Sequence, residues 1–210
     1  MSRTLVVGRR PRARLVPILG LVAAVLAGAA GCGDTPPGTP AGAKPDASNF
    51  PSAGTELRPA TLRPGQPVPV PAGKALLTLT GKVSAVNRNS SVALDRAGLA
   101  KLGLVQVRVY EPWVRQTLDF RGVWLADLLK VAGAAADVST VRVTALDDYF
   151  VDLQMTDIQA GGILLATEAG DGTQIPIEKG GPTRIVFLNG VRAGANADQW
   201  IWSLKTIDAR

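Results

Sequence analysis

The chain of 210 residues contains no histidine and a single cysteine, Cys32. Zinc sites and the Ser-His-Asp or Cys-His arrangements of nucleophilic catalysis depend on these side chains, and iron–sulfur clusters and most haem groups need them as well. The sequence also has no Gly-rich phosphate-binding motif between a strand and a helix. An enzyme built from this sequence would therefore rely on carboxylates, lysine, tyrosine or a cofactor held without a protein thiolate.

Long hydrophobic runs are also scarce, and the most apolar one, residues 15–30, is shorter than the about 20 residues that a membrane-spanning helix needs. Five arginines and no acidic residue precede it, and the small residues 29–31 lead directly to Cys32. This order is typical of a bacterial lipoprotein signal. The sequence therefore predicts a signal peptide over residues 1–31 and lipidation of Cys32. The alternatives are an ordinary secretory signal with an unrelated cysteine and an uncleaved anchor.

Removal of the signal changes the charge of the protein. The whole chain has 23 basic and 17 acidic residues, but residues 1–31 hold five of the basic ones and none of the acidic ones. The mature chain is therefore close to neutral, and the basic excess that would favour a nucleic-acid partner is lost. We expect a protein outside the cytoplasm, held on the bacterial membrane by its lipid chains. The Arg9-Arg10 pair leaves the twin-arginine export route open beside the general secretory route.

The segment after Cys32, residues 33–73, contains ten of the fifteen prolines and has no hydrophobic periodicity. Such a composition is typical of an extended linker. Residues 32–73 are therefore predicted to be the lipidated cysteine and a tether that holds the folded domain away from the membrane. Val68 and Val70 alternate with prolines, which is compatible with an extended strap along the domain.

The remaining residues, 74–210, are enough for one domain with a sizeable hydrophobic core. Short apolar runs, several of them alternating with polar residues, predict strands. These runs lie at 75–80, 105–110, 140–146, 149–153, 163–167, 184–188 and 200–207.

Helical signals are few. Asp95 is a candidate N-cap for a short helix over 96–101, an apolar stripe over 123–132 ends at Gly133, and Thr156 is a candidate cap for a single turn. The predicted fold class is therefore α+β, with a mixed or mainly antiparallel sheet and two or three short helices.

Five segments follow one another through this domain: F-R-G-V-W-L-A-D-L-L (120–129), A-L-D-D-Y (145–149), I-L-L-A-T-E-A-G-D-G-T-Q-I-P (163–176), G-G-P-T-R-I-V (180–186) and a tryptophan-containing strand (200–207). Their order and spacing resemble the oxidoreductase molybdopterin-binding domain of the sulfite-oxidase type. The resemblance covers essentially all of 74–210 and implies an irregular α+β domain with a mixed sheet.

The resemblance also implies where a cofactor would be held. Catalytic members hold molybdenum through a cysteine thiolate in the loop after the strand that here reads V-Q-V-R-V-Y-E-P-W, but residues 110–113 include no cysteine. Members that bind the cofactor commonly have a histidine where this chain has Lys179. The chain is closer to small relatives that also lack the cysteine, although Asp147 replaces their usual asparagine. We therefore expect no metal ligand and no bound molybdopterin, although the resemblance itself implies that cofactor.

Two groups of residues are candidates for a site. Asp147 and Asp148, which precede Tyr149, form an acid/base pair only if their side chains converge; otherwise they belong to an exposed hairpin turn.

The second group is the turn formed by Lys179, Gly180 and Gly181. Its backbone N–H groups, together with Lys179 and Arg184, are a candidate anion site, whereas the alternative is a tight turn that needs the glycines for its geometry alone. Of the four tryptophans, Trp113 lies in an expected loop and is the one predicted to be exposed, which makes it a further candidate for binding a ligand or partner.

The expected function is that of a cell-envelope lipoprotein whose molybdopterin-oxidoreductase-like domain is degenerate and non-catalytic, and which binds a small anion or a protein partner. One alternative is a molybdopterin-dependent oxidoreductase that works with a redox partner. The other is a structural or assembly module without a ligand.

Overall fold

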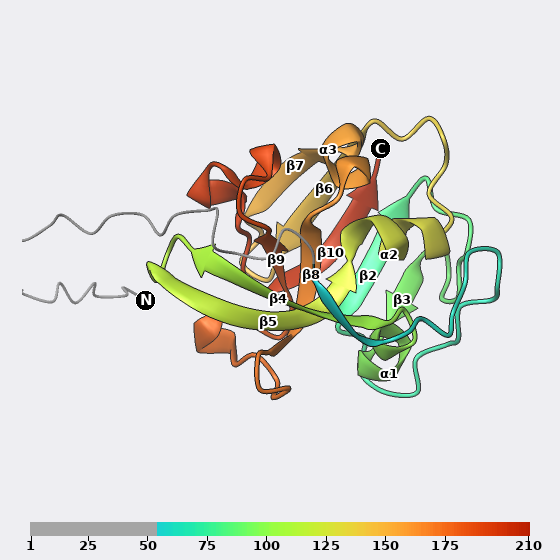
Figure 1. The fold of residues 1–210 in the computed structure, drawn as a ribbon. Helices are drawn as coiled ribbons and strands as arrows, with labels where there is room; N and C mark the ends of the chain where they lie inside the picture. Colours follow the sequence, from blue (N-terminus) through green and yellow to red (C-terminus); the bar gives the residue numbers. More distant parts are fainter. Residues whose placement is uncertain (1–53) are drawn as a thin grey trace, which may run out of the picture. The chain divides into compact units, whose positions relative to one another are not determined.

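The structure, a computed structural model, describes residues 54–210 (Figure 1). The expected signal sequence, Cys32 and the first part of the expected tether lie outside these residues. Within residues 54–210, no helix has both the length and the hydrophobicity needed to cross a membrane.

In the described part of the chain, ten strands form two five-stranded sheets. The first sheet is antiparallel throughout, in the order β1 (Thr55–Arg58), β4 (Leu104–Glu111), β5 (Gln116–Trp124), β8 (Ile163–Ala169), β9 (Arg184–Phe187). The second sheet has the order β3 (Val92–Leu94), β2 (Leu77–Gly81), β10 (Leu204–Ala209), β6 (Thr140–Ala145), β7 (Phe150–Gln154). It is mixed, because β2 and β10 run parallel while its other pairs are antiparallel.

Three short helices complete the domain: α1 (Arg96–Ala100), α2 (Leu125–Val131) and α3 (Met155–Ala160). Single 3-10 turns are η2 (Ile177–Lys179), η3 (Arg192–Gly194) and η4 (Ala197–Gln199). The predicted α+β class, with a mixed and mainly antiparallel arrangement and short helices, is confirmed by this architecture.

One hydrophobic core is shared by both sheets. In β6 the buried residues Val141, Val143 and Ala145 alternate with partly exposed ones, as expected for a strand with one face on the core. Strand β8, by contrast, is buried from Ile163 to Thr167, in keeping with its place between β5 and β9. The helix α2 packs against β5 and β8 with its leucines buried.

The helix predictions need correction at their boundaries. Asp95 caps α1 as expected, since its carboxylate accepts the Gly98 N–H at 2.8 Å. Val123, however, belongs to β5, so the apolar stripe joins the end of a strand to the helix that begins at Leu125. The cap position of α3 is Gln154, whereas Thr156 lies inside the helix.

The folded domain begins earlier than Lys74, the expected boundary. Strand β1 pairs with β4, and Leu62 and Val68 are buried in the core, whereas Val70 is 67% exposed. Polar contacts also hold this segment, because Asp95 accepts the Gly73 N–H at 3.2 Å. A proline-rich stretch without periodicity can therefore pack when isolated apolar side chains reach a core that other segments have formed.

The hairpin of β4 and β5, the longest among residues 54–210, carries its turn to the left side of Figure 1, where the 3-10 turns η3 and η4 also lie. Trp113 in this turn donates its indole N–H to the Ala197 carbonyl oxygen at 3.0 Å. The end of the hairpin is therefore joined to the segment that precedes β10. Residues from all of these elements meet at the candidate site.

Candidate functional site

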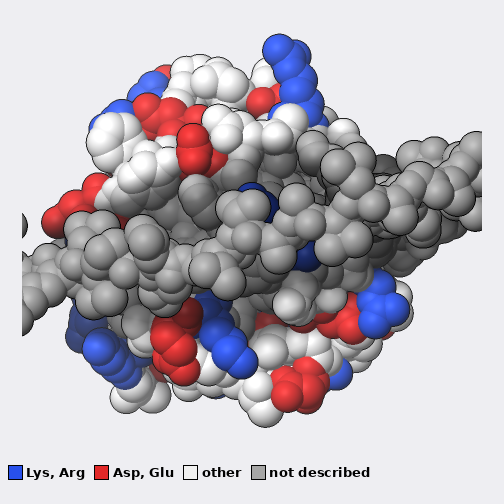
Figure 2. Space-filling model, turned by 90° about the vertical axis from the view of Figure 1, so that its left-hand side faces the viewer, with Lys and Arg blue, Asp and Glu red and all other residues white. Residues whose placement is uncertain are grey.

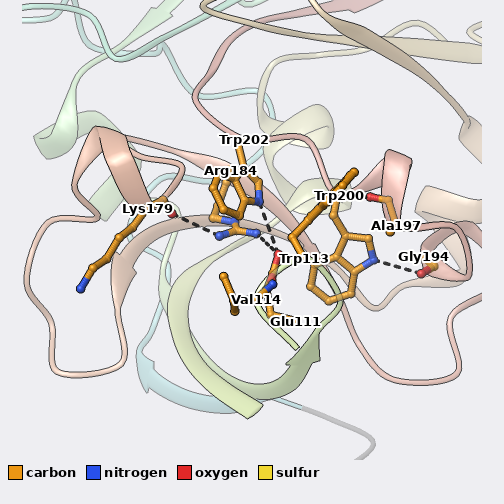
Figure 3. Close-up of polar contacts among 9 residues, drawn as sticks. All are labelled: Glu111, Trp113, Val114, Lys179, Arg184, Gly194, Ala197, Trp200 and Trp202. Atoms are coloured by element: carbon orange, nitrogen blue, oxygen red, sulfur yellow. Dashed lines mark hydrogen bonds and ion pairs between the residues drawn. The ribbon is translucent and has the colours of Figure 1, made fainter. Parts of the chain in front are cut away.

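A buried ion pair lies at the centre of this region. Glu111 is the last residue of β4 and Arg184 is the first residue of β9, and the strands β5 and β8 lie between them in the same sheet. The Arg184 Nη2 and Glu111 Oε1 atoms are 2.5 Å apart, and the side chains are 3% and 0% exposed (Figure 3). The first sheet therefore curves so that the end of β4 meets the start of β9.

Both carboxylate oxygens of Glu111 are engaged. Oε2 accepts the backbone N–H of Val114 at 2.7 Å, which fixes the β4–β5 turn. Oε1 accepts the guanidinium hydrogen bond and also the indole N–H of Trp202 at 3.4 Å. Because a buried carboxylate needs such partners to stay charged, this set satisfies Glu111 within the protein.

The Arg184 guanidinium lies between two aromatic rings, with its central carbon 4.6 Å from the Trp202 ring centroid and 5.1 Å from that of Phe120. Its Nη1 donates to the Lys179 carbonyl oxygen at 3.2 Å. Burial lowers the pKa of Arg184 from its ordinary value, and the charge and hydrogen bond of Glu111 oppose this shift. An arginine side chain stays protonated in proteins, so the pair is ionic and its charges cancel.

The turn at Lys179 does not form the expected anion site. The Gly180 and Gly181 N–H groups donate to the carbonyl oxygens of Ile177 and Pro176 at 3.0 and 2.8 Å, so they are used inside the turn. Figure 3 shows the Lys179 ammonium group pointing away from the ion pair. The two cationic residues line one cavity, but their charged groups do not converge, and Glu111 neutralises Arg184.

The structure nevertheless explains why position 180 is a glycine. Its backbone has φ +85°, and a Cβ atom placed there would lie 2.7 Å from atoms of the Trp202 indole. Gly180 therefore permits both the left-handed turn and the close approach of Trp202.

A cavity of about 580 Å³ adjoins Arg184 and Trp202. Lys179 lies at its edge, but Asp119, Asp171 and Glu178 line it as well. Arg108 pairs with Asp119 at 2.9 Å. The charges around this cavity are thus mixed, which does not favour a polyanionic ligand. On the face of the molecule drawn in Figure 2, acidic and basic side chains are interspersed over the described surface.

The adjacent aspartates of the β6–β7 hairpin point to different partners. Asp148 has φ +68° and pairs with Lys205, whereas the Asp147 carboxylate accepts the Tyr149 N–H at 3.2 Å. Tyr149 in turn donates its hydroxyl to the Asp198 carbonyl oxygen at 3.0 Å. The structure therefore brings Asp147 and Tyr149 together but not Asp148, and the aspartates belong to the exposed hairpin turn.

Trp113 is 53% exposed, as its expected loop position suggested. It lies beside Trp200 and Trp202, and with Tyr149 these three tryptophans line one pocket. The sequence interpretation did not single out Glu111, Phe120 or Asp198. A signal for Glu111 was available, because it shares a strand face with the buried Val107 and Val109 at intervals of two residues.

The family model of the oxidoreductase molybdopterin binding domain matches residues 94–210. The chain belongs to the oxidoreductase molybdopterin-binding domain family. A solved structure with the same fold is the sulfane dehydrogenase SoxCD from Paracoccus pantotrophus, with a TM-score of 0.50 and 15% sequence identity. The similarity covers 63% of this chain and 37% of that one. No curated protein matches the chain in sequence.

The residues at the centre of this family domain do not fit thiolate-ligated molybdenum. Residues 54–210 contain neither cysteine nor histidine, and no group of three or more potential metal-ligating side chains occurs among them. The carboxylate of Glu111, in the segment where the resemblance places the thiolate, is a hard donor that already has three partners. A molybdenum centre therefore finds neither a thiolate nor an imidazole ligand among residues 54–210.

Proposed function

We propose that the protein is a lipid-anchored, extracytoplasmic binding protein built on a non-catalytic molybdopterin-oxidoreductase domain. The observation that carries this proposal is the Glu111–Arg184 pair, because Glu111 lies in the segment where the resemblance places the metal-binding thiolate of catalytic members. Both carboxylate oxygens of Glu111 already have partners within the protein, so this residue is not free to take the place of a metal ligand.

The binding role is assigned to the face around Trp113. Of the two partner classes expected from sequence, the small anion loses support because Arg184 is neutralised and the turn N–H groups are used internally. Large apolar side chains remain exposed on the hairpin turns of this face, with Trp113 at 53%, Val114 at 42% and Tyr149 at 49%. Exposed aromatic side chains gathered in this way are typical of binding surfaces.

The alternative is a molybdopterin-dependent oxidoreductase, which the family membership supports. Elemental analysis and pterin fluorescence of the protein produced in a host that makes the cofactor decide between the two. We expect well under 0.1 molybdenum atom per chain and no pterin. Molybdenum near one atom per chain would overturn the non-catalytic proposal.

The proposed location depends on residues outside the described part of the chain. It is supported by the signal sequence that ends at Cys32 and by the proline-rich stretch that follows it. Membrane fractionation of the full chain tests this part separately from the metal analysis.

A further inference from the structure

A small aromatic pocket lies on the face around Trp113. It has a volume of about 260 Å³, below the roughly 300–1,000 Å³ typical of pockets for drug-sized ligands. Its walls come from the β4–β5 turn, the β6–β7 hairpin, η4 and the segment before β10. The lining residues are Trp113, Ala145, Asp147, Tyr149, Asp198, Trp200, Ile201 and Trp202.

The aromatic side chains of this pocket are held in place by their polar edges. The indole N–H groups of Trp113 and Trp200 donate to the carbonyl oxygens of Ala197 and Gly194, each at 3.0 Å (Figure 3). Tyr149 donates its hydroxyl to the Asp198 carbonyl oxygen at 3.0 Å. Because these donors are already used, they are not available to hydrogen-bond a ligand, which would contact the aromatic rings instead.

The charged residues that line this pocket are all acidic. Asp147 and Asp198 line it, and none of its described lining residues is a lysine or an arginine. One oxygen of Asp147 accepts the Tyr149 N–H, while the Asp198 carboxylate accepts no hydrogen bond from residues 54–210. Negative charge beside electron-rich ring faces favours a cation, because both attract positive charge.

We propose that this pocket binds a small organic cation carrying a quaternary or methylated ammonium group. This inference rests on the proposed binding role of the face around Trp113 and names its ligand class. A methylated ammonium has an apolar surface that packs on ring faces and a charge that the carboxylates attract, and it needs no hydrogen-bond donor from the protein. An anion would be repelled by Asp147 and Asp198.

The test is calorimetric titration of the full chain, in a maltoside detergent, with choline as the probe. The comparison ligand is 3,3-dimethyl-1-butanol, which has the same shape without the charge. We expect choline to bind and the neutral compound to bind at least about tenfold more weakly. Absence of choline binding at millimolar concentration, or equal binding of both compounds, would overturn the proposal.

Matched variants separate the pocket from the surrounding surface. Trp113→Ala and Tyr149→Ala should each weaken choline binding at least about tenfold. Phe150→Ala is the control, because Phe150 is 49% exposed like Tyr149 but contacts Arg142 and does not line the pocket. An equal effect of Phe150→Ala and Tyr149→Ala would contradict the assignment.

The carboxylates have a matched control as well. Asp147→Asn and Asp198→Asn should weaken choline binding several-fold, whereas Asp148→Asn should not, because Asp148 pairs with Lys205 away from the pocket. Asparagine also tolerates the positive φ of Asp148. Unchanged affinity in both pocket variants would show that charge plays no part and would overturn the proposal.

Two further ligands identify the source of the cation. Tighter binding of glycerophosphocholine than of choline indicates a lipid headgroup, and weaker binding indicates a free cation; either result keeps the ammonium site. Binding of a lysine-containing peptide without binding of choline would assign the pocket to a partner protein and reject the small cation. Molybdenum analysis of the same preparation is independent, since a metal-free protein that fails to bind choline refutes only the ligand class.

Discussion

Glu111 and Arg184 are 73 residues apart in the sequence, yet their side chains form a buried ion pair with a 2.5 Å contact. The pair connects two strands of one sheet that are not neighbours. The pair also contacts Trp202: the Arg184 guanidinium lies over the Trp202 ring, and the Trp202 indole N–H donates to Glu111. The centre of this family domain is thus held together by charge in the segment where its catalytic members are expected to use a metal.

Removal of one partner of this ion pair should strongly reduce the free energy of unfolding. Glu111→Gln leaves the Arg184 charge buried without a counter-ion, and we expect a loss of about 3–5 kcal/mol in the free energy of unfolding, measured by urea denaturation. Glu178→Gln, at an exposed position lining the cavity beside Arg184, should stay within about 0.5 kcal/mol of the wild type. A loss below about 1 kcal/mol in Glu111→Gln would show that the pair is not buried as described.

The segment before Lys74 should contribute to stability. A chain that begins at Gly54 keeps β1 and the buried side chains of Leu62 and Val68, whereas a chain that begins at Lys74 loses them. Burial of each such side chain is worth about 1.5–3 kcal/mol, so the shorter chain should unfold at clearly lower urea concentration. Equal urea midpoints for the two chains would support the domain boundary at residue 74 that the sequence predicts.

Asp95 should link stability to pH. The Gly98 N–H, followed by the Gly73 N–H, holds the pKa of this carboxylate below its usual value. Its stabilising effect is therefore fully present above the unfolded-state pKa of about 3.9 and is lost as the pH falls through the lower folded-state pKa. Asp95→Ala should lose about 0.5–2 kcal/mol at pH 7, and the difference from the wild type should shrink in acid.

The control for Asp95 is Asp127→Ala. Asp127 forms an exposed ion pair with Lys130 at 3.3 Å and should contribute less than about 1 kcal/mol. Denaturation curves from pH 2.5 to 7 distinguish the two variants. A constant difference between Asp95→Ala and the wild type over this range would contradict the linkage.

Gly180 should be intolerant of a side chain because of Trp202. Gly180→Ala places a Cβ atom 2.7 Å from the indole at a φ of +85°. Gly190 has a φ of +83° with nothing near its Cβ position, so Gly190→Ala measures the backbone strain alone. We expect Gly180→Ala to lose at least about 1 kcal/mol more than Gly190→Ala and to change the tryptophan fluorescence. Equal losses would show that Trp202 moves aside without cost.

Cys32 should decide the location of the protein. Cys32→Ser removes the sulfur atom that the lipid chains require, so the variant should leave the membrane fraction or accumulate as an unprocessed precursor. Fractionation followed by mass determination measures both outcomes. A variant that is processed and sediments with membranes like the wild type would refute the lipoprotein signal.

The sequence by itself determined the fold class and the family, because both depend on local patterns. Alternating residues such as those of β6 predict a strand, and a carboxylate before an apolar stretch predicts the cap of α1. The sequence patterns did not predict β5, because its polar residues precede the apolar stripe that continues into α2. They did not predict β1 either, because its residues are all exposed and it pairs with β4 at the edge of the sheet.

Only the tertiary structure decided the site. The neutralisation of Arg184 depends on a carboxylate 73 residues away, and the pocket at Trp113 depends on four segments that meet only when both sheets have formed. Lys179 and Arg184 look like one cationic pair in sequence, but one side chain points to solvent and the other is enclosed by Glu111, Phe120 and Trp202. Burial and ion pairing are properties of a side chain's neighbours in space, which local sequence patterns do not specify.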